Sequence, residues 1–386
     1  MMKIEIYHPI LWSKYKAAVF TQVSRLALRE GSNAQFVQVA ESERQRVALN
    51  TVDLSYHQYP YRLLFKGTYD DIPKAKLASA AFKAGWTSDA DLILTPGFSD
   101  IAHWALLLAA KLRRKKVATF CDSTLRDRPQ SSLKGVLKRT YFHFCDGYFS
   151  YGTRGREYLL HYGAKPDRIF RRVQAAGLPA GYSEDAAFSA RAGTPPGEPS
   201  MPPRPTLLYV GRLSGEKGLD LLLRAFHALL ETYPGARLDI AGSGPSANEL
   251  KAQAEALGIT GSVQFLGGLP LDEITARYAR ADLFVLPSRS EPWGLVVNEA
   301  LHYGCPVIVS DACGCAPDIV EEGVNGYTFI SDDEQDLRAK LELGVRTFAD
   351  HAATARACLQ SVAPFNPAAS AAQILAGCHA IMDRAA

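Results

Sequence analysis

Two basic and two acidic residues in the second half of the chain could together hold a ligand that carries both phosphates and hydroxyls. Arg212 and Lys217 lie in the segment GRLSGEKG, where glycines let the backbone approach a ligand and two cations suit a diphosphate. Glu291 and Glu299 flank a run with no other charge, in SEPWGLVVNEAL. Carboxylates beside a phosphate site are unfavourable unless they bind hydroxyls, so sugar and ribose hydroxyls are their expected partners.

A further anion-binding element needs no side chain. We expect a helix to begin near Gly294, and the free N–H groups of its first turn, which includes Leu295 and Val296, would point at an anion. Glu299 then lies more than a turn inside that helix. Trp293, just before it, is expected to pack in the interior, with stacking on a sugar as the alternative.

The elements that must position these residues read as parallel strands alternating with helices. Five apolar runs of the second half are typical of strands buried on both faces: TLLYVG, RLDIAGSG, VQFLGG, LFVLPS and PVIVSD. The first half shows KIEIYH, DLILTPG, KVATFCD and GYFSYG in the same role. We predict an α/β fold of two Rossmann-like, doubly wound domains facing each other across a cleft, with ligands beyond the carboxyl ends of the strands.

The predicted domain boundary is the segment RAGTPPGEPSMPPRP, residues 191–205, because proline, glycine and serine give a connector little to bury. The first domain would then span 1–190 and the second 206–362. A helix at 363–386 would follow, with a return to the first domain as one arrangement for it.

The two halves carry opposite net charge. Residues 1–204 hold 30 lysines and arginines against 18 acidic residues, or +12, and the remainder carries −9. The first domain should therefore face something anionic, and either a membrane surface or an anionic acceptor fits. Nucleic acid is not expected, because the sequence has no zinc-finger spacing, recognition helix or aromatic-glycine RNA motif. The densest basic cluster, KLRRKK at 111–116, can also be the C-terminus of a helix that covers a sheet.

Composition favours a globular chain with a large core. The longest apolar run, WALLLAA, is much shorter than the roughly 20 residues that span a bilayer. We expect a cytoplasmic protein, with peripheral association at the inner face of the cell membrane as an extension of that prediction. The seven cysteines do not suggest a disulfide framework, and the spacing of Cys313 and Cys315 is a weak metal signal, so no metal site is predicted.

Five motifs in order closely resemble family 4 of the retaining glycosyltransferases, which have the two-domain B-type fold. They are GRLSGEKG, IAGSGP, FLGGLP, PSRSEPWGLVVNEAL and GVNGYTF, and the resemblance is strong from about 206 to 330. It implies that Glu291 contacts the donor sugar and Glu299 the ribose, while Arg212 and Lys217 hold the diphosphate. Backbone groups complete the implied donor site: Gly211 and Gly242 at strand ends, Gly294, Leu295 and Val296 at the helix start, and Gly267 and Leu269 near the base.

The first half departs from that family. YHPILWSKYKAAVF stands where the family has a glycine-rich loop, so donor or acceptor contacts from this loop are in doubt. A histidine is common after the strand that here reads KVATFCDST, and this chain offers Asp122 instead. Asp122 could hold the donor sugar or the acceptor hydroxyl, or it could be a turn aspartate.

The resemblance implies a retaining transfer of a sugar from a nucleotide diphosphate sugar, with a UDP- or GDP-sugar as donor and no separate cofactor. The acceptor would be a hydroxyl of a saccharide or lipid-linked saccharide in cell-surface polysaccharide or glycolipid synthesis, and no protein nucleophile is assigned. Asp89-Ala90-Asp91 has the letters of a metal-diphosphate motif but precedes a strand, so we set it aside. A sugar-nucleotide epimerase on the same plan and a non-catalytic polymer- or membrane-binding scaffold remain the alternatives.

Overall fold

The chain folds into two compact units, each built around one parallel β-sheet. The computed structural model describes residues 1–44, 52–126, 132–193 and 204–384. One unit comprises Met1–Gly177 with Phe365–Ala386, and the other comprises Leu178–Pro364. The two parallel sheets confirm the predicted fold class of two Rossmann-like α/β domains, while the cleft between them stays a prediction.

The sheet of the first unit has seven strands in the order β3-β2-β1-β4-β5-β6-β7. The chain winds outward from β1 through β2 to β3, then crosses to β4 on the other side of β1 and continues to β7. Parallel pairing is seen throughout. The strands are β1 (Lys3–Ile10), β2 (Asn33–Ala40), β3 (Tyr61–Leu63), β4 (Leu92–Thr95), β5 (Lys116–Cys121), β6 (Gly147–Tyr151) and β7 (Ile169–Arg172).

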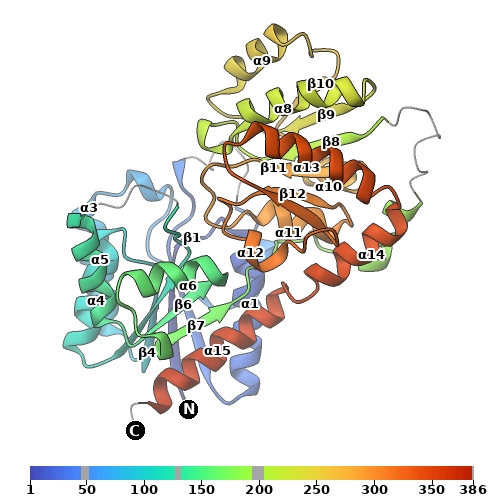
Figure 1. The fold of residues 1–386 in the computed structure, drawn as a ribbon. Coiled ribbons are helices and arrows are strands. Elements are labelled where there is room, and N and C mark those ends of the chain that lie inside the picture. Colours follow the sequence, from blue (N-terminus) through green and yellow to red (C-terminus); the bar gives the residue numbers. More distant parts are fainter. Residues whose placement is uncertain (45–51, 127–131, 194–203, 385–386) are drawn as a thin grey trace. The chain divides into compact units, whose positions relative to one another are not determined.

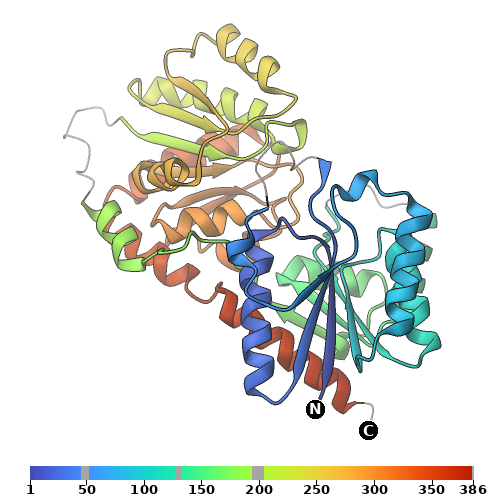
Figure 2. The ribbon, with the colours of Figure 1, turned by 180° about the vertical axis from the view of Figure 1, so that it is seen from behind.

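Helices cover both faces of this first sheet (Figures 1 and 2). One face packs against α1 (Lys14–Arg29) and α15 (Pro367–Asp383), whose apolar residues share one core cluster with β1 and β4. The other face packs against α3 (Lys74–Thr87), α4 (Ile101–Leu112), α5 (Ser132–Phe144) and α6 (Gly152–His161). Helix α15 therefore completes the core of the first unit.

The sheet of the second unit has six strands in the order β10-β9-β8-β11-β12-β13. Every residue of β11 and β12 is buried, as their apolar sequences LFVL and VIVS predict. The strands are β8 (Thr206–Val210), β9 (Arg237–Ala241), β10 (Val263–Gly267), β11 (Leu283–Leu286), β12 (Val307–Ser310) and β13 (Gly326–Phe329). The helices are α7 (Glu184–Ala192), α8 (Leu219–Thr232), α9 (Ala247–Ala256), α10 (Leu271–Arg280), α11 (Leu295–His302), α12 (Ala316–Ile319), α13 (Glu334–Thr347) and α14 (His351–Val362).

The compact units divide the chain differently from the predicted domains. Most of the expected linker, residues 194–203, lies outside the described residues. Helix α7, which the sequence analysis divides between the first domain and the linker, belongs to the second unit. There the buried guanidinium of Arg191 donates to the Ala281 carbonyl oxygen. A buried arginine that binds carbonyl oxygens at the C-terminus of α10 explains why the helix stays with the second unit.

Candidate functional site

The strand order of the second sheet reverses between β8 and β11, and the predicted binding residues follow these two strands. In open parallel sheets the loops after such neighbouring strands run to opposite faces, which leaves a crevice at their carboxyl ends. Arg212 and Lys217 follow β8, and Glu291 and Gly294 follow β11. The structure thus brings these four of the selected residues to one topological switch point.

Lys217 and Glu291 form a direct ion pair across this switch point. The Lys217 Nζ lies 2.6 Å from the Glu291 Oε2, and only 18% and 16% of the two side chains are exposed. The carboxylate of Glu291 therefore compensates the charge of the lysine. Because the pair is little screened, it also fixes the position of both side chains before any ligand arrives.

Arg212 has an acidic partner of its own. Its guanidinium pairs with Glu216, four residues further along the chain, and the Ser214 hydroxyl donates to the same Oε1 at 2.7 Å. Burial alone would raise the pKa of Glu216, but the hydrogen bonds from Ser214 and Arg212 outweigh it and lower the pKa to about 2. Arg212 keeps 48% of its side chain exposed, so it can reach a ligand while it remains paired.

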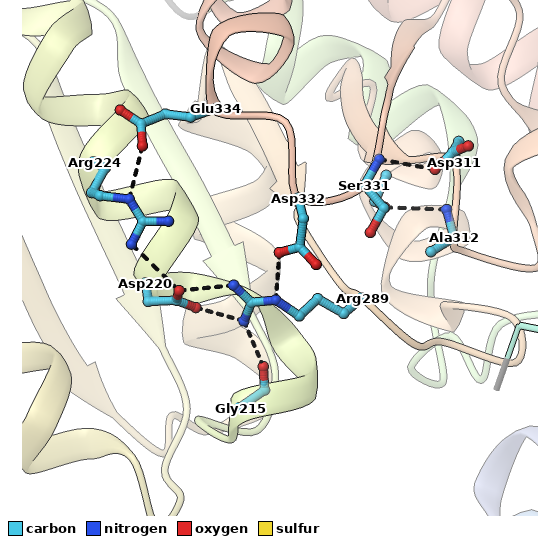
Figure 3. Close-up of polar contacts among 10 residues, drawn as sticks. Gly215, Asp220, Arg224, Arg289, Asp311, Ala312, Ser331, Asp332 and Glu334 are labelled. Carbon is cyan, nitrogen blue, oxygen red and sulfur yellow. Dashed lines mark hydrogen bonds and ion pairs between the residues drawn. The ribbon is translucent and has the colours of Figure 1, made fainter. Parts of the chain in front are cut away.

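Arg289 ties together the two loops that carry Lys217 and Glu291, and the sequence analysis did not select it. Figure 3 shows its guanidinium bound in bidentate fashion to Asp220, at 2.7 and 2.8 Å, and also to Asp332. Its Nη1 donates to the Gly215 carbonyl oxygen at 2.9 Å, and its backbone N–H donates to the Glu216 carbonyl oxygen at 2.9 Å.

The network around Arg289 extends along helix α8. Arg224 binds Asp220 at 3.4 Å and Glu334 at 2.8 Å, so the start of α8 is connected to the start of α13 (Figure 3). The signal in the sequence was an arginine inside the PSRSEPWG motif, two residues before the predicted glutamate Glu291. The contact of Arg289 with Asp220 could not be predicted, because no sequence spacing rule pairs these two residues.

Helix α11 presents the predicted N-terminus. Its N-cap residue Gly294 has φ +100°, in the left-handed region that glycine tolerates best. Leu295 and Val296 form the first turn, where backbone N–H groups lack partners within the helix. Trp293 is 4% exposed and its indole N–H donates to Asn298 Oδ1 at 2.8 Å, which supports the packing role over stacking on a sugar.

Glu299 lies on α11 beside the hydroxyl of Tyr278, which donates to its Oε2 at 3.2 Å. Burial raises the pKa of Glu299 to about 7, and the hydrogen bond from Tyr278 opposes part of that rise. The carboxyl group is thus half ionised near neutral pH. A ligand that offers further hydroxyl donors would favour the ionised form.

The ends of β8, β9 and β10 come unusually close together. Gly242 has φ +143°, and a Cβ added there would lie 1.8 Å from the carbonyl oxygen of Gly211. The Gly242 N–H donates to the Gly267 carbonyl oxygen at 2.7 Å. Gly267 is exposed and Leu269 is partly buried, so the backbone predicted to meet a base is accessible at this edge.

Asp122 is the one predicted catalytic residue that lies in the first unit. It follows β5 directly and is exposed.

The segment Asp89-Ala90-Asp91, set aside as a metal motif, makes structural contacts instead. Asp89 pairs with the Lys3 side chain at 2.6 Å, and Asp91 accepts the Lys3 backbone N–H at 2.8 Å. These contacts hold the start of β1.

The basic cluster at 111–116 also makes structural contacts. Lys111 and Lys116 both pair with Asp146, at 2.5 and 3.7 Å, and Lys115 donates to the Ala90 carbonyl oxygen at 2.7 Å. This supports the reading of a helix end that covers a sheet. No helix within the described ranges is long and apolar enough to cross a membrane.

The cysteines are structural in the described chain. All seven are buried free thiols, and burial raises the pKa of Cys315 well above its usual value. Across the described ranges, histidine, cysteine, aspartate and glutamate form no group of three that could hold a metal ion.

Comparisons with known proteins match a segment that lies within the second unit. Residues 196–346 match the family described as glycosyl transferases group 1. The chain is 39% identical over 150 residues to a glycogen synthase of Mycobacterium tuberculosis, which covers 39% of this chain and 35% of the relative. It is 36% identical over 130 residues to a GDP-mannose-dependent phosphatidylinositol monomannoside mannosyltransferase of Mycolicibacterium smegmatis, covering 32% of this chain and 34% of the relative. The matched segments thus span about a third of the length of these curated relatives.

Solved structures extend the likeness in fold to the whole chain. The Anabaena protein HepE, crystallised with UDP and glucose, superposes with a TM-score of 0.71 at 19% identity, covering 98% of this chain and 100% of that one. At this level of identity the likeness concerns the fold, which is the B-type glycosyltransferase fold.

Proposed function

We propose that this chain, which carries a glycosyl transferases group 1 domain, transfers a sugar from a nucleotide diphosphate sugar to an acceptor hydroxyl. The observation that carries the proposal is the convergence of Arg212, Lys217, Glu291 and the start of α11 at one switch point. The motif order of the sequence and the family match at 196–346 support the same reaction.

The departing diphosphate develops negative charge, and the site offers three stabilising elements for it. Lys217 and Arg212 supply cationic donors, and the first turn of α11 supplies backbone N–H groups. Each cation exchanges or shares its carboxylate partner, Glu291 or Glu216, when a phosphate enters. Glu291 released from Lys217 is then free to accept hydroxyls of the donor sugar.

The remaining donor contacts follow from the strand ends. Glu299 accepts the ribose hydroxyls, and the backbone at Gly267 and Leu269 meets the base. The mannosyltransferase relative is named for GDP-mannose and HepE was crystallised with UDP, so both nucleotides belong in a donor screen.

We further propose a retaining course without a protein nucleophile, in which the leaving phosphate takes the acceptor's proton on the same face of the sugar. The acceptor is a saccharide or lipid-linked saccharide of the cell surface. Asp122 holds the acceptor hydroxyl or the donor sugar from the first unit.

The experiment is to incubate the chain with UDP- and GDP-sugars and to follow nucleoside diphosphate release with and without saccharide acceptors. Acceptor-dependent release supports the transferase. A change in the sugar that needs no acceptor would indicate the epimerase alternative, and donor binding without turnover would indicate a scaffold. The anomeric configuration of the product, read by NMR, tests retention.

The location is proposed to be cytoplasmic, with peripheral contact to an anionic membrane through the first unit. Its basic balance supports this, since each exposed lysine or arginine near an anionic leaflet adds about 1 kcal/mol. The contacts of Lys111 and Lys116 with Asp146 reduce the free charge of the 111–116 cluster. Flotation with anionic and neutral vesicles at two salt concentrations tests this membrane contact. Equal binding to both vesicle types would exclude it.

A further inference from the structure

The carboxyl edge of the first sheet holds two buried cations side by side. Lys16, in the first turn of α1, is 9% exposed, and Arg172, the last residue of β7, is 1% exposed. Both donate to the same neutral acceptor, the hydroxyl of Tyr151 at the end of β6. Ligands of open parallel sheets bind at this edge, so the position is one where a binding group is expected.

Aromatic rings surround the two charges without neutralising them. The Arg172 guanidinium lies 4.1 Å from the centroid of the Tyr151 ring and 4.9 Å from that of Phe120. The Lys16 Nζ lies 4.7 Å from the Tyr151 centroid and 5.8 Å from that of Phe120. Cation–π contacts recover part of the hydration that burial removes, but they leave two positive charges next to each other.

The hydrogen-bonding capacity of Arg172 is largely unused. Its Nη2 donates to Tyr151 and, at 3.3 Å, to Gln174, while its Nε and Nη1 are buried and have no hydrogen-bond partner. Among the described residues, no carboxylate forms an ion pair with Arg172 or Lys16. Asp122, exposed after β5, acts on both charges through space only.

The electrostatic strain of this cluster is visible in its neighbours. Burial, followed by repulsion from Arg172, lowers the pKa of Lys16. His8 on β1 is kept neutral, since burial and the charge of Lys16 lower its pKa to about 3. An arrangement that places two cations together, without a hydrogen-bonded acid, costs stability unless a ligand supplies the missing negative charge.

We propose that Lys16 and Arg172 form an anion-binding site that recognises a phosphate or carboxylate group on the acceptor. An anionic group has enough oxygens to accept from Lys16 Nζ at one oxygen and from an unused N–H of Arg172, at Nε or at Nη1, at another. Lys16 is the more exposed of the two, so an entering anion contacts Lys16 before Arg172. That the anion belongs to an acceptor rests on the proposed transferase function. The anion site itself rests on contacts within the first unit alone.

Direct binding tests the site without any need for turnover. The probes are inorganic phosphate, glucuronate and, as a neutral reference, glucose, each titrated calorimetrically into the full chain. Lys16→Gln and Arg172→Gln should each weaken binding of the preferred anion tenfold or more. Lys14→Gln and Arg171→Gln, which change a partly exposed and an exposed cation on the same two elements, should change it less than twofold. Preference for phosphate or for glucuronate tells a phosphorylated from a uronate-containing acceptor.

The donor site provides the second control, because phosphate could also bind beside Lys217. Lys217→Gln should leave the affinity of the first-unit site unchanged. Anion binding that is lost in Lys217→Gln but kept in Lys16→Gln overturns the proposal, as does the absence of binding by both anions. If the buried Arg172→Gln variant fails to fold, Lys16→Gln carries the test, with its thermal unfolding as the check on integrity.

The failure of this proposal is distinguishable from failure of the proposed function. Acceptor-dependent sugar transfer with anion affinity unchanged in Lys16→Gln removes the anion site and keeps the transferase. Anion binding that depends on Lys16, in a chain that transfers no sugar, keeps the site and removes its assignment to an acceptor.

Discussion

The cations of the two candidate sites are held in opposite ways. In the second unit, Lys217 and Arg212 are each paired with a carboxylate, Glu291 and Glu216. In the first, Lys16 and Arg172 share only a neutral hydroxyl. A paired cation is positioned at little electrostatic cost and can exchange partners, whereas an unpaired buried cation is costly until an anion arrives. The second site is therefore preorganised by its own acids, and the first depends on what binds.

The largest effect should come from removing the paired cation of the second unit. Lys217→Met should lower turnover about 100-fold, because it removes a donor to the developing phosphate charge and leaves Glu291 unpaired beside it. Arg212→Met should cost about tenfold, since Arg212 is half exposed. Steady-state kinetics, with the exposed Lys251→Met as control, measure both. Normal turnover in both variants would remove the diphosphate assignment.

The buried carboxyl of the second unit should make stability depend on pH. The pKa of Glu299 is raised to about 7 in the folded chain, so the folded state holds a proton that the unfolded state releases near its ordinary value. The free energy of unfolding should therefore fall as the pH rises from about 4.5 through about 7, by about 3 kcal/mol from this group. Urea unfolding at pH 5 and 8 should show this loss in the wild type but not in Glu299→Gln. Glu255→Gln, a change at an exposed glutamate, is the control and should keep the pH dependence of the wild type. The same pH dependence in Glu299→Gln as in the wild type would contradict the assignment to Glu299.

The two glutamates should fail in different ways. Glu299→Ala should weaken the free nucleoside diphosphate and the sugar nucleotide alike, by about tenfold, as expected for loss of uniform binding. Glu291→Ala should leave nucleoside diphosphate affinity nearly unchanged and lower kcat more than it raises KM. Calorimetry and kinetics separate these outcomes, and the reverse pattern would show that the roles are exchanged.

Arg289 should contribute to turnover because its contacts position the two loops of the second site. Arg289→Ala should lower kcat several-fold, up to about tenfold, because the turn with Lys217 loses its tie to the loop with Glu291. Arg289→Lys should restore little, since lysine cannot reproduce the bidentate contact with Asp220. A purely structural role would lower the melting temperature without changing kcat below it.

The smallest expected effect is the change in stability when Lys16 of the first unit is replaced. Without anions in the buffer, Lys16→Met should leave the free energy of unfolding unchanged or raise it by about 1 kcal/mol, because it relieves repulsion with Arg172. Lys217→Met should instead lower it by a similar amount, since Glu291 loses its partner. Chemical denaturation measures both, and destabilisation of equal size in the two variants would contradict the contrast.

The sequence was sufficient for the fold class and for the residues at the ends of β8 and β11. Continuous apolar runs predict buried parallel strands, and strand ends in such sheets are binding positions, so Arg212, Lys217 and Glu291 could be found by pattern. Arg289 and Arg172 could not, because their partners Asp220 and Tyr151 are distant in sequence. The assignment of α7 to the second unit depends likewise on the carbonyl oxygens that meet Arg191 only in the folded chain.

Helix α15 has a consequence for the order in which the chain can acquire its structure during synthesis. The helix supplies Ile374, Leu375 and Ile381 to a core whose strands lie almost entirely within the first 177 residues. A ribosome makes the whole second unit before it releases these residues. Until then the part of the sheet face that α15 covers stays exposed in the first unit, although α1 already packs on the same face. Shortening the chain at residue 364 should yield a soluble second unit next to an aggregation-prone first one.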